Sequence, residues 1–248
     1  MRYASPATPR DLPAAELLLW PGLALLATLM SRRTDIDMRL SALFFDPVTA
    51  RFPHREEWLW SSLLHTDIKK VSTLVFVALI ALAVRAWRSG RTEQLPPLLF
   101  TLAGALLALT LNSHLKHLSP HSCPWSLQAF GGSAEYFRIL SPVPAAAGPG
   151  ACLPSGHAAT GFMWLPGVYA CLRWQPRLAL PAATAAILLG LLCGLTQIVR
   201  GAHFLSHIML TAAVCGSTGS VLHHLCAAWP RPAMRQPDTA DTRDTPCA

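Results

Sequence analysis

Histidines, basic residues and a hydroxyl residue gather in three short segments between apolar runs of this 248-residue chain. The segments are 112–125, which reads NSHLKHLSPHSCPW, 152–157, which reads CLPSGH, and 197–207, which reads QIVRGAHFLSH. Imidazoles exchange protons near neutral pH, and cationic side chains bind anions. These residue types together indicate chemistry on an anionic group.

The tetrapeptide Pro154-Ser155-Gly156-His157 predicts a helix start, where free backbone N–H groups and the positive end of the helix dipole suit a phosphate oxyanion. Lys116 and Arg200 add fixed positive charge. His157 and His203 can then divide the attack on phosphorus from the protonation of the leaving oxygen. The chemistry that these residues predict is phosphoryl transfer.

The composition predicts a membrane protein. Apolar residues make up 52% of the chain and charged residues 13%, with a mean hydropathy of +0.37, whereas soluble domains carry about 25% charged residues. Although the net charge is +7, the basic residues form no dense stretch, so a nucleic-acid partner is not expected. The apolar content excludes disorder, and seven scattered cysteines exclude a small disulfide-rich domain. We therefore expect an all-α, polytopic membrane protein.

Six apolar segments come close to the length of about 20 residues that a membrane-spanning helix needs. They are 14–30, 71–87, 96–111, 156–172, 178–197 and 204–228. The third is short unless its helix continues past Asn112 toward Lys116, and Trp20-Pro21-Gly22 predicts a kink in the first. A bundle of six transmembrane helices follows, with residues 1–230 as a single domain and residues 231–248 as a disordered cytoplasmic tail.

The basic residues predict the orientation of these helices, because short cytoplasmic loops are rich in Lys and Arg. An N-terminus inside the cell places ten arginines in the cytoplasm: Arg2, Arg10, Arg85, Arg88, Arg91, Arg173, Arg177, Arg231, Arg235 and Arg243. Both termini are then cytoplasmic, and the three polar segments lie together on the outer side. We expect a bacterial inner-membrane protein whose site faces the periplasm.

Two outer segments are long enough to cover that site. Residues 31–70 carry both basic and acidic side chains and predict a partly ordered periplasmic cap with an amphipathic piece at 58–64. Residues 112–155 form a charge-poor, long active-site loop. Cys123 and Cys152 flank this loop in an oxidising compartment and predict a disulfide, worth about 3 to 4 kcal/mol in the chain-entropy model.

The three segments resemble the motifs of the type-2 phosphatidic acid phosphatase superfamily, integral-membrane lipid phosphatases that share their site with vanadium haloperoxidases. These motifs are Lys-x6-Arg-Pro, Pro-Ser-Gly-His and Ser-Arg-x5-His-x3-Asp. The second motif is complete at 154–157. The first keeps Lys116 but has Cys123 in place of arginine, and the third keeps His203 but has Gln197 for arginine and His207 for aspartate. The resemblance extends over about residues 98–222.

The resemblance implies a role for each matching residue. His203 would be the nucleophile that forms a phosphohistidine, and His157 would protonate the leaving oxygen. Ser155, the Gly156 amide and Lys116 would hold the phosphoryl oxygens. The family needs no metal or other cofactor for this reaction, and the segments lack the carboxylates that magnesium prefers.

The two departures suggest substitutes. If residues 196–207 are helical or nearly so, Arg200 lies one turn from Gln197 and can replace the missing arginine. A nucleophilic imidazole also needs an acceptor that fixes its tautomer. His207 or Glu135, the only acid of the long loop, can accept that hydrogen bond.

The sequence therefore predicts a membrane lipid phosphatase that hydrolyses a phosphomonoester or pyrophosphate. Phosphatidate, phosphatidylglycerol phosphate, a polyprenyl pyrophosphate and the phosphate of lipid A all fit. Transfer of the phosphate to another lipid, and an inactive protein that only binds anionic lipid, are alternatives. A metal site is a further one, because the histidine pairs 117/121 and 203/207 have helical spacing. The expected partners are the phosphorylated lipid and the bilayer, and the oligomeric state stays open, a homodimer included.

Overall fold

The computed structural model describes residues 14–226, and these residues are helical with no strand beyond two isolated β-bridges. The predicted all-α class is therefore confirmed for the described residues. The terminal arginines, among them Arg2 and Arg10, and the predicted tail 231–248 lie outside them.

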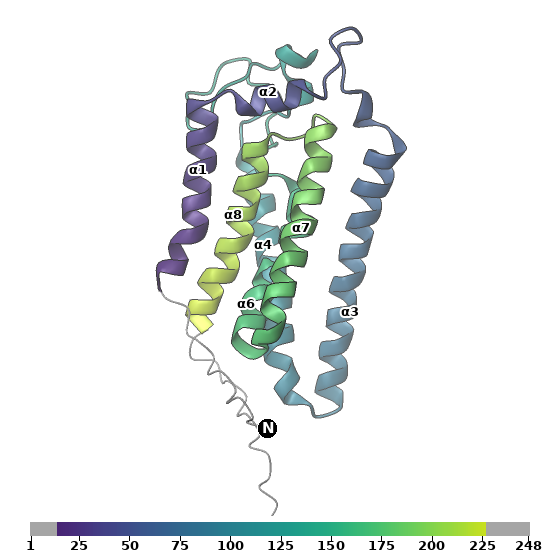
Figure 1. Ribbon diagram of the computed structural model, residues 1–248, viewed down its shortest axis with the longest axis vertical. Coiled ribbons are helices and arrows are strands. Elements are labelled where there is room, and N and C mark those ends of the chain that lie inside the picture. The colour runs from purple at the N-terminus through teal and green to yellow at the C-terminus, as the bar shows by residue number, and fades with distance from the viewer. Residues whose placement is uncertain (1–13, 227–248) are drawn as a thin grey trace, which may run out of the picture.

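Five helices run along the long axis of the molecule (Figure 1): α1 (Leu19–Arg33), α3 (Ile68–Arg88), α4 (Leu95–Leu118), α7 (Pro176–Val199) and α8 (Leu205–Leu225). The 10-residue α6 (Leu165–Trp174) covers only part of that length. The shorter elements are η1 (Ala14–Leu18), α2 (Ile36–Ala42), η2 (Pro53–Arg55), η3 (Leu59–Asp67), η4 (Thr92–Gln94), η5 (Pro124–Ser126), η6 (Gln128–Phe130) and α5 (Gly156–Phe162). Helix α8 is central, because it packs against α1, α4, α5 and α6.

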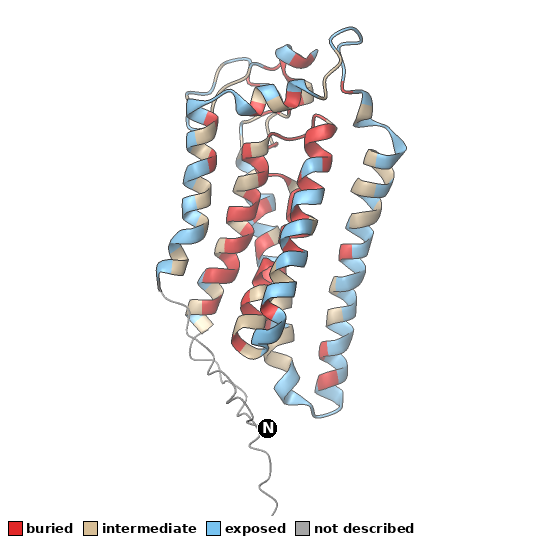
Figure 2. Cartoon of the chain, viewed as in Figure 1, coloured by how far each residue is buried: buried red, intermediate tan, exposed pale blue. Residues whose placement is uncertain are grey.

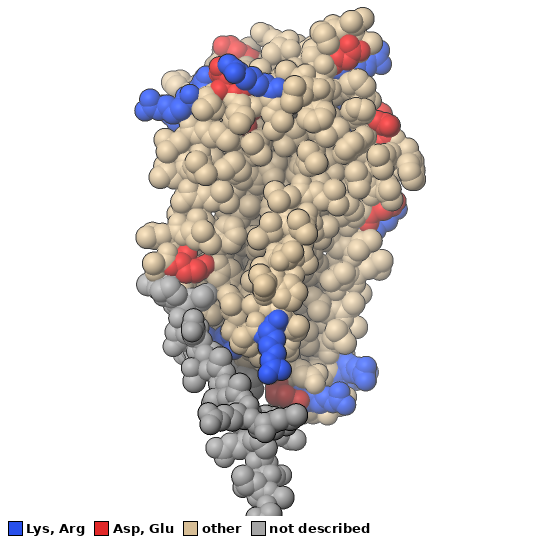
Figure 3. All heavy atoms as spheres, in the orientation of Figure 1, with Lys and Arg blue, Asp and Glu red and all other residues tan. Residues whose placement is uncertain are grey.

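The outer surface of the bundle is apolar. Buried residues line the faces that the central helices turn toward one another, whereas large apolar side chains such as Leu180 and Leu188 are exposed (Figure 2). Charged side chains gather toward the two ends of the molecule (Figure 3). Three described helices, spanning Thr92–Leu118, Pro176–Val199 and Leu205–Leu225, are long and apolar enough to cross a membrane. The predicted count of six spans is thus supported for three of them.

Two predicted spans differ from their expected form. The first begins as the 3-10 helix η1, and α1 starts at Leu19, so Pro21 lies in the first turn of the α-helix, where its missing N–H removes no intrahelical bond. The fourth is divided into α5 and α6 at Met163 and Trp164. Pro166 lies at the start of α6, where a backbone N–H would have no acceptor within the helix, so proline costs no hydrogen bond there.

Helix α4 continues to Leu118, so the first seven residues of the predicted loop 112–155 are helical. The apolar run of the third span was short unless its helix continued past Asn112. The helix does continue there, and it has 24 residues. Lys116 consequently projects from the last turn of a helix, whose backbone fixes its position better than a loop would.

Residues 196–207 are helical except at the break between α7 and α8. Helix α7 ends at Val199, and Gly201 adopts a left-handed φ of 68° before α8 begins at Leu205. A Cβ at Gly201 would also lie 2.4 Å from the ring of Phe52. Only glycine adopts this φ readily and leaves room for the Phe52 ring, so this turn packs closely against the segment 31–70.

The segment 31–70 lies over one end of the bundle, which we name the capped end, with α2 across it (Figure 1). Three phenylalanine rings, Phe45, Phe52 and Phe130, pack with centroids 5.3 to 5.4 Å apart. Phe45 and Phe52 belong to the cap and Phe130 to the long loop. The two outer segments therefore share one aromatic core and hold each other in place.

Candidate active site

The structure brings the three polar segments together at the capped end. Lys116 lies in the last turn of α4, His157 in the first turn of α5, and His207 in the first turn of α8. His203 lies in the short connection between α7 and α8 and is 5% exposed. Residues that are far apart in the sequence thus share one buried site.

The Ser155 turn is anchored to two other helices. Its backbone N–H donates to Thr211 Oγ1 of α8 over 2.8 Å, and its carbonyl accepts from Asn112 Nδ2 of α4 over 3.2 Å. Its hydroxyl oxygen caps α5 by accepting from the Ala158 N–H at 3.3 Å. Ser155 is fully buried. Its place at the helix start is therefore fixed from three sides.

Lys116 lies directly over this helix start. A Cβ added to Gly156 would be 3.6 Å from Lys116 Nζ, an ordinary contact distance, so the ammonium group lies close to this glycine. The first amides of a helix have no intrahelical acceptor. The ammonium and the start of α5 together form a positively charged surface that fits phosphoryl oxygens.

His157 is held by the cap. Its Nε2 lies 3.0 Å from the carbonyl oxygen of Leu64, and because a carbonyl only accepts, Nε2 carries the proton. The other ring nitrogen, Nδ1, is buried and has no hydrogen-bond partner. The ring of His65 packs on that of His157 with centroids 4.2 Å apart. His65 Nδ1 in turn accepts a hydrogen bond of 3.1 Å from Gln197 Nε2.

His203 and His207 face each other through their Nδ1 atoms, which are 3.4 Å apart. Burial, and then electrostatic coupling to His207 and the positive charge of Lys116, lowers the pKa of His203 well below its usual value of 6.5. The imidazole of His203 is therefore neutral at pH 7. A hydrogen bond between the Nδ1 atoms leaves Nε2 of His203 as the nitrogen available for attack on a substrate.

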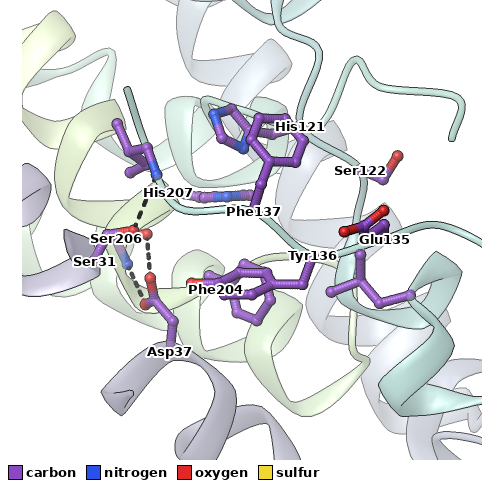
Figure 4. A pocket seen from close by; sticks show the side chains of 12 residues that line it. Ser31, Asp37, His121, Ser122, Glu135, Tyr136, Phe137, Phe204, Ser206 and His207 are labelled. Carbon is purple, nitrogen blue, oxygen red and sulfur yellow. Dashed lines mark hydrogen bonds between the residues drawn. The ribbon is translucent and has the colours of Figure 1, made fainter. Parts of the chain in front are cut away.

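Of the two predicted acceptors for His203, His207 lies at hydrogen-bonding distance. Glu135 is exposed and lines a cavity of about 10 Å³, the room of about one water molecule, together with His207 (Figure 4). Asp37 of α2 lines the same cavity and is 2% exposed. Its carboxylate accepts from the backbone N–H and the hydroxyl of Ser206 at 3.0 and 2.6 Å and so provides an acceptor for a free N–H in the first turn of α8.

Arg200 reaches the cap, where its Nε donates to the carbonyl oxygen of Arg55 over 3.0 Å. Burial is the main cause that lowers the pKa of its guanidinium. Although no continuous helix connects it to His207, Arg200 remains one turn after Gln197 at the end of α7. Its positive charge acts on both His65 and His157.

The expected disulfide is present, since Cys123 and Cys152 are bonded. Cys152 Sγ also lies 3.4 Å from His203 Nδ1. Cys152, His203 and His207 place potential metal-ligand atoms within 4.8 Å of one another. A disulfide sulfur is not a thiolate, however, and the thiolate is the form of cysteine that binds metal. This group consequently offers two imidazoles.

Sequence reasoning missed His65 and Asp37. Both belong to the cap, and their partners lie 132 and 169 residues further along the chain. No local motif marks either residue. The one available signal was that Gln197 stands where the motif has arginine. This change implies a compensating group but does not indicate where in the chain that group lies.

Comparison with solved structures finds the same fold. The chain matches the crystal structure of a transmembrane PAP2 type phosphatidylglycerolphosphate phosphatase from Bacillus subtilis, with a TM-score of 0.54 and 15% sequence identity. The match covers 88% of this chain and 100% of that one. No curated protein sequence matches the chain. The sequence pattern of the PAP2 superfamily matches residues 97–231, more than half of the chain and all three polar segments, and the chain therefore belongs to the PAP2 superfamily.

Proposed function

We propose that this protein is a membrane lipid phosphatase that hydrolyses a phosphomonoester or pyrophosphate of a lipid. The observation that carries the proposal is the meeting of His157, His203 and Lys116 at one buried site. Among the described residues, no carboxylate is hydrogen-bonded to either histidine. Such a site favours a negatively charged group and supplies both a nucleophile and an acid.

In the proposed reaction, Nε2 of His203 attacks phosphorus and the bond between phosphorus and the leaving oxygen breaks. His207 accepts the Nδ1 proton of His203 in a hydrogen bond and so orients the ring. His157 takes up a proton on its unpartnered Nδ1 when the anionic phosphate binds, and it gives that proton to the leaving oxygen. Water then attacks phosphorus and gives a proton to Nδ1 of His157, while the bond between phosphorus and Nε2 of His203 breaks, which releases phosphate and regenerates both imidazoles.

Positive charge stabilises the transferring group in this scheme. Lys116 and the amide of Gly156 lie on one side, and Ser155 can donate its hydroxyl proton while its oxygen caps α5. Arg200 supplies a second cation from the end of α7. Preorganised donors of this kind contribute more than any other single effect in many enzymes.

The proposed setting is the bacterial inner membrane, with six spans, the capped end in the periplasm and both termini in the cytoplasm. The apolar outer surface and the three helices long enough to span support membrane insertion. The disulfide fits an oxidising compartment at the capped end. Phosphatidate, phosphatidylglycerol phosphate, a polyprenyl pyrophosphate and lipid A are the substrates to test.

The decisive experiment offers these lipids to purified protein in detergent, with and without EDTA, and measures phosphate release. Replacing His203 with Ala should abolish release, because no nucleophile remains. His117→Ala is the matched control, since His117 is an exposed histidine in the last turn of the same α4 that carries Lys116. Loss of activity in EDTA would instead favour a metal site at His203 and His207.

Three other outcomes are informative. Phosphate recovered on an added lipid, with none in solution, would identify a phosphotransferase. Equal and negligible release by the wild type and His203→Ala would point to a protein that only binds anionic lipid. A rate that falls as soon as the pH drops to 6.5 would conflict with the lowered pKa of His203, since that pKa keeps the nucleophile neutral further into acid.

A further inference from the structure

One histidine of the cap lies inside the proposed site. His65 belongs to η3, a π-helix, and its ring packs 4.2 Å from that of His157 between centroids. The preceding residue, Leu64, accepts the Nε2 proton of His157 through its carbonyl oxygen at 3.0 Å. Two successive cap residues thus contact the proposed acid. π-Helical turns are often found at functional sites.

The proton of His65 can be located from its partner. Gln197 Nε2 is 3.1 Å from His65 Nδ1, and an amide nitrogen only donates. His65 Nδ1 therefore accepts, and the single proton of the neutral ring lies on Nε2. Gln197 is 3% exposed, so it holds this orientation from within the bundle.

The surroundings of His65 are positively charged. Burial, followed by the charges of Arg200, Lys69 and Lys116, lowers the pKa of His65 to about 4. No acidic group contributes to this environment. At neutral pH His65 is therefore an uncharged hydrogen-bond donor among cations, and an anion is the ligand that would bring these groups together.

We infer that His65 is a phosphate-binding residue, whose imidazole is oriented by Gln197 and donates from Nε2 to a phosphoryl oxygen of the substrate. In this role His65 and Gln197 together supply the donor that an arginine at position 197 would supply alone. The cap then completes the binding site in addition to covering it. The inference rests on the proposed phosphatase function.

The competing explanation is that His65 only packs the cap onto the bundle. The variant His65→Phe separates the two, because phenylalanine keeps an aromatic ring against His157 and removes the N–H donor. His54→Ala is the matched control, since His54 is an exposed cap histidine paired with Glu57. All variants are tested as full-length protein in detergent.

Two measurements are made on each variant: kcat and KM for phosphate release, and the rise in melting temperature caused by inorganic phosphate. For His65→Phe we expect kcat/KM to fall at least about tenfold, as for a lost charge-assisted hydrogen bond, and the phosphate-induced rise to shrink. His54→Ala should match the wild type in both. If His65→Phe also matches the wild type in both, the inference is wrong.

A rescue variant tests the link with Gln197. An arginine at 197 is longer than glutamine and can carry its guanidinium into the space that the shortened residue 65 leaves. The double variant His65→Ala/Gln197→Arg should therefore recover kcat/KM relative to His65→Ala. If the folded double variant neither recovers kcat/KM nor is stabilised by phosphate, His65 and Gln197 do not share this role.

The phosphate measurement also separates this inference from the proposed function. If no lipid is hydrolysed but phosphate stabilises the wild type and not His65→Phe, the binding role stands and the proposed reaction fails. If lipid is hydrolysed equally by both proteins, the reaction stands and the role of His65 fails. If the wild type neither hydrolyses lipid nor responds to phosphate, both are overturned.

Discussion

Two buried polar clusters lie at opposite ends of the bundle, and they differ in charge. At the end away from the cap, the carboxylate of Glu16 accepts from the hydroxyl groups of Tyr169 and Ser220 and lies 3.5 Å from His224 Nε2. Trp20 Nε1 donates to the same Tyr169 hydroxyl over 2.6 Å. This cluster joins η1, α1, α6 and α8 around one shared acid.

The site at the capped end has the opposite character. Lys116 and Arg200 act on its histidines, and burial keeps His65 and His203 neutral. Both clusters contain buried polar atoms without a hydrogen-bond partner, Nδ1 of His157 at the capped end and Nδ1 of His223 at the far end among them, so the difference between the clusters is one of charge. A structural cluster supplies its own counter-charge, whereas a site for an anion leaves that charge to the ligand. The contrast predicts that substitutions at the capped end change catalysis and that those at the far end change stability.

After the abolished release expected for His203→Ala, the largest effect is expected from His157. Replacing it with Ala removes the proton donor for the leaving oxygen and should lower kcat about 10²- to 10⁴-fold, the usual contribution of general acid catalysis. KM should change little, because Lys116 still binds the phosphate. Steady-state kinetics on the preferred lipid test this. A substrate with a more acidic leaving group should lose less rate, and an equal loss on both would contradict the acid role.

The next effect concerns the orientation of His203. His207→Ala removes the group at 3.4 Å from its Nδ1 and should lower kcat about 10- to 100-fold, as expected when a positioned hydrogen bond is lost. His207→Asp restores an acceptor and should recover part of that loss. Glu135→Ala should stay within about twofold, because its exposed side chain is not bonded to His203. Retained activity in His207→Ala would show that something else orients the nucleophile.

A smaller effect is expected at Arg200. Arg200→Ala should lower kcat/KM at least about tenfold, the share of one charged contact to phosphate. Arg55→Ala provides the control, because Arg200 donates its hydrogen bond to the backbone carbonyl of Arg55, which the substitution retains. Kinetics at low and high salt should show the larger salt dependence in the wild type. Full activity of Arg200→Ala would make this arginine merely an anchor of the cap.

The parts of the site that sequence could predict are those written in contiguous residues. Ser155, Gly156 and His157 form one helix start, and because they are adjacent in the chain, their relative positions follow from the helix geometry alone. The disulfide followed from two cysteines placed at the ends of one loop. The helices were predictable because lipid-facing segments need long apolar runs.

The missed parts depend on tertiary contacts. A break such as Gly201 needs both a left-handed backbone and the nearby Phe52 ring to be understood, and only the first has a sequence signal. His65 and Asp37 reach the site because η3 and α2 fold over the bundle. In the phosphate-binding role that we propose for His65, the changed motif residue Gln197 is compensated from a distant segment.

The smallest effect on catalysis is expected at Glu16. Glu16→Gln removes the charge that Tyr169 and Ser220 share, and should cost about 1 to 3 kcal/mol of stability, as for hydrogen bonds to a charged group. For a protein of this size each kcal/mol shifts the melting temperature by about 2 to 4 °C. Glu93→Gln, which removes an exposed acid of η4, should leave the melting temperature unchanged. Phosphate release at 25 °C should stay within about twofold in both variants, because the far cluster shares no residue with the site. A large loss of kcat in a stably folded Glu16→Gln protein would mean that the two ends are coupled through α8, on which Ser220 and His207 both lie.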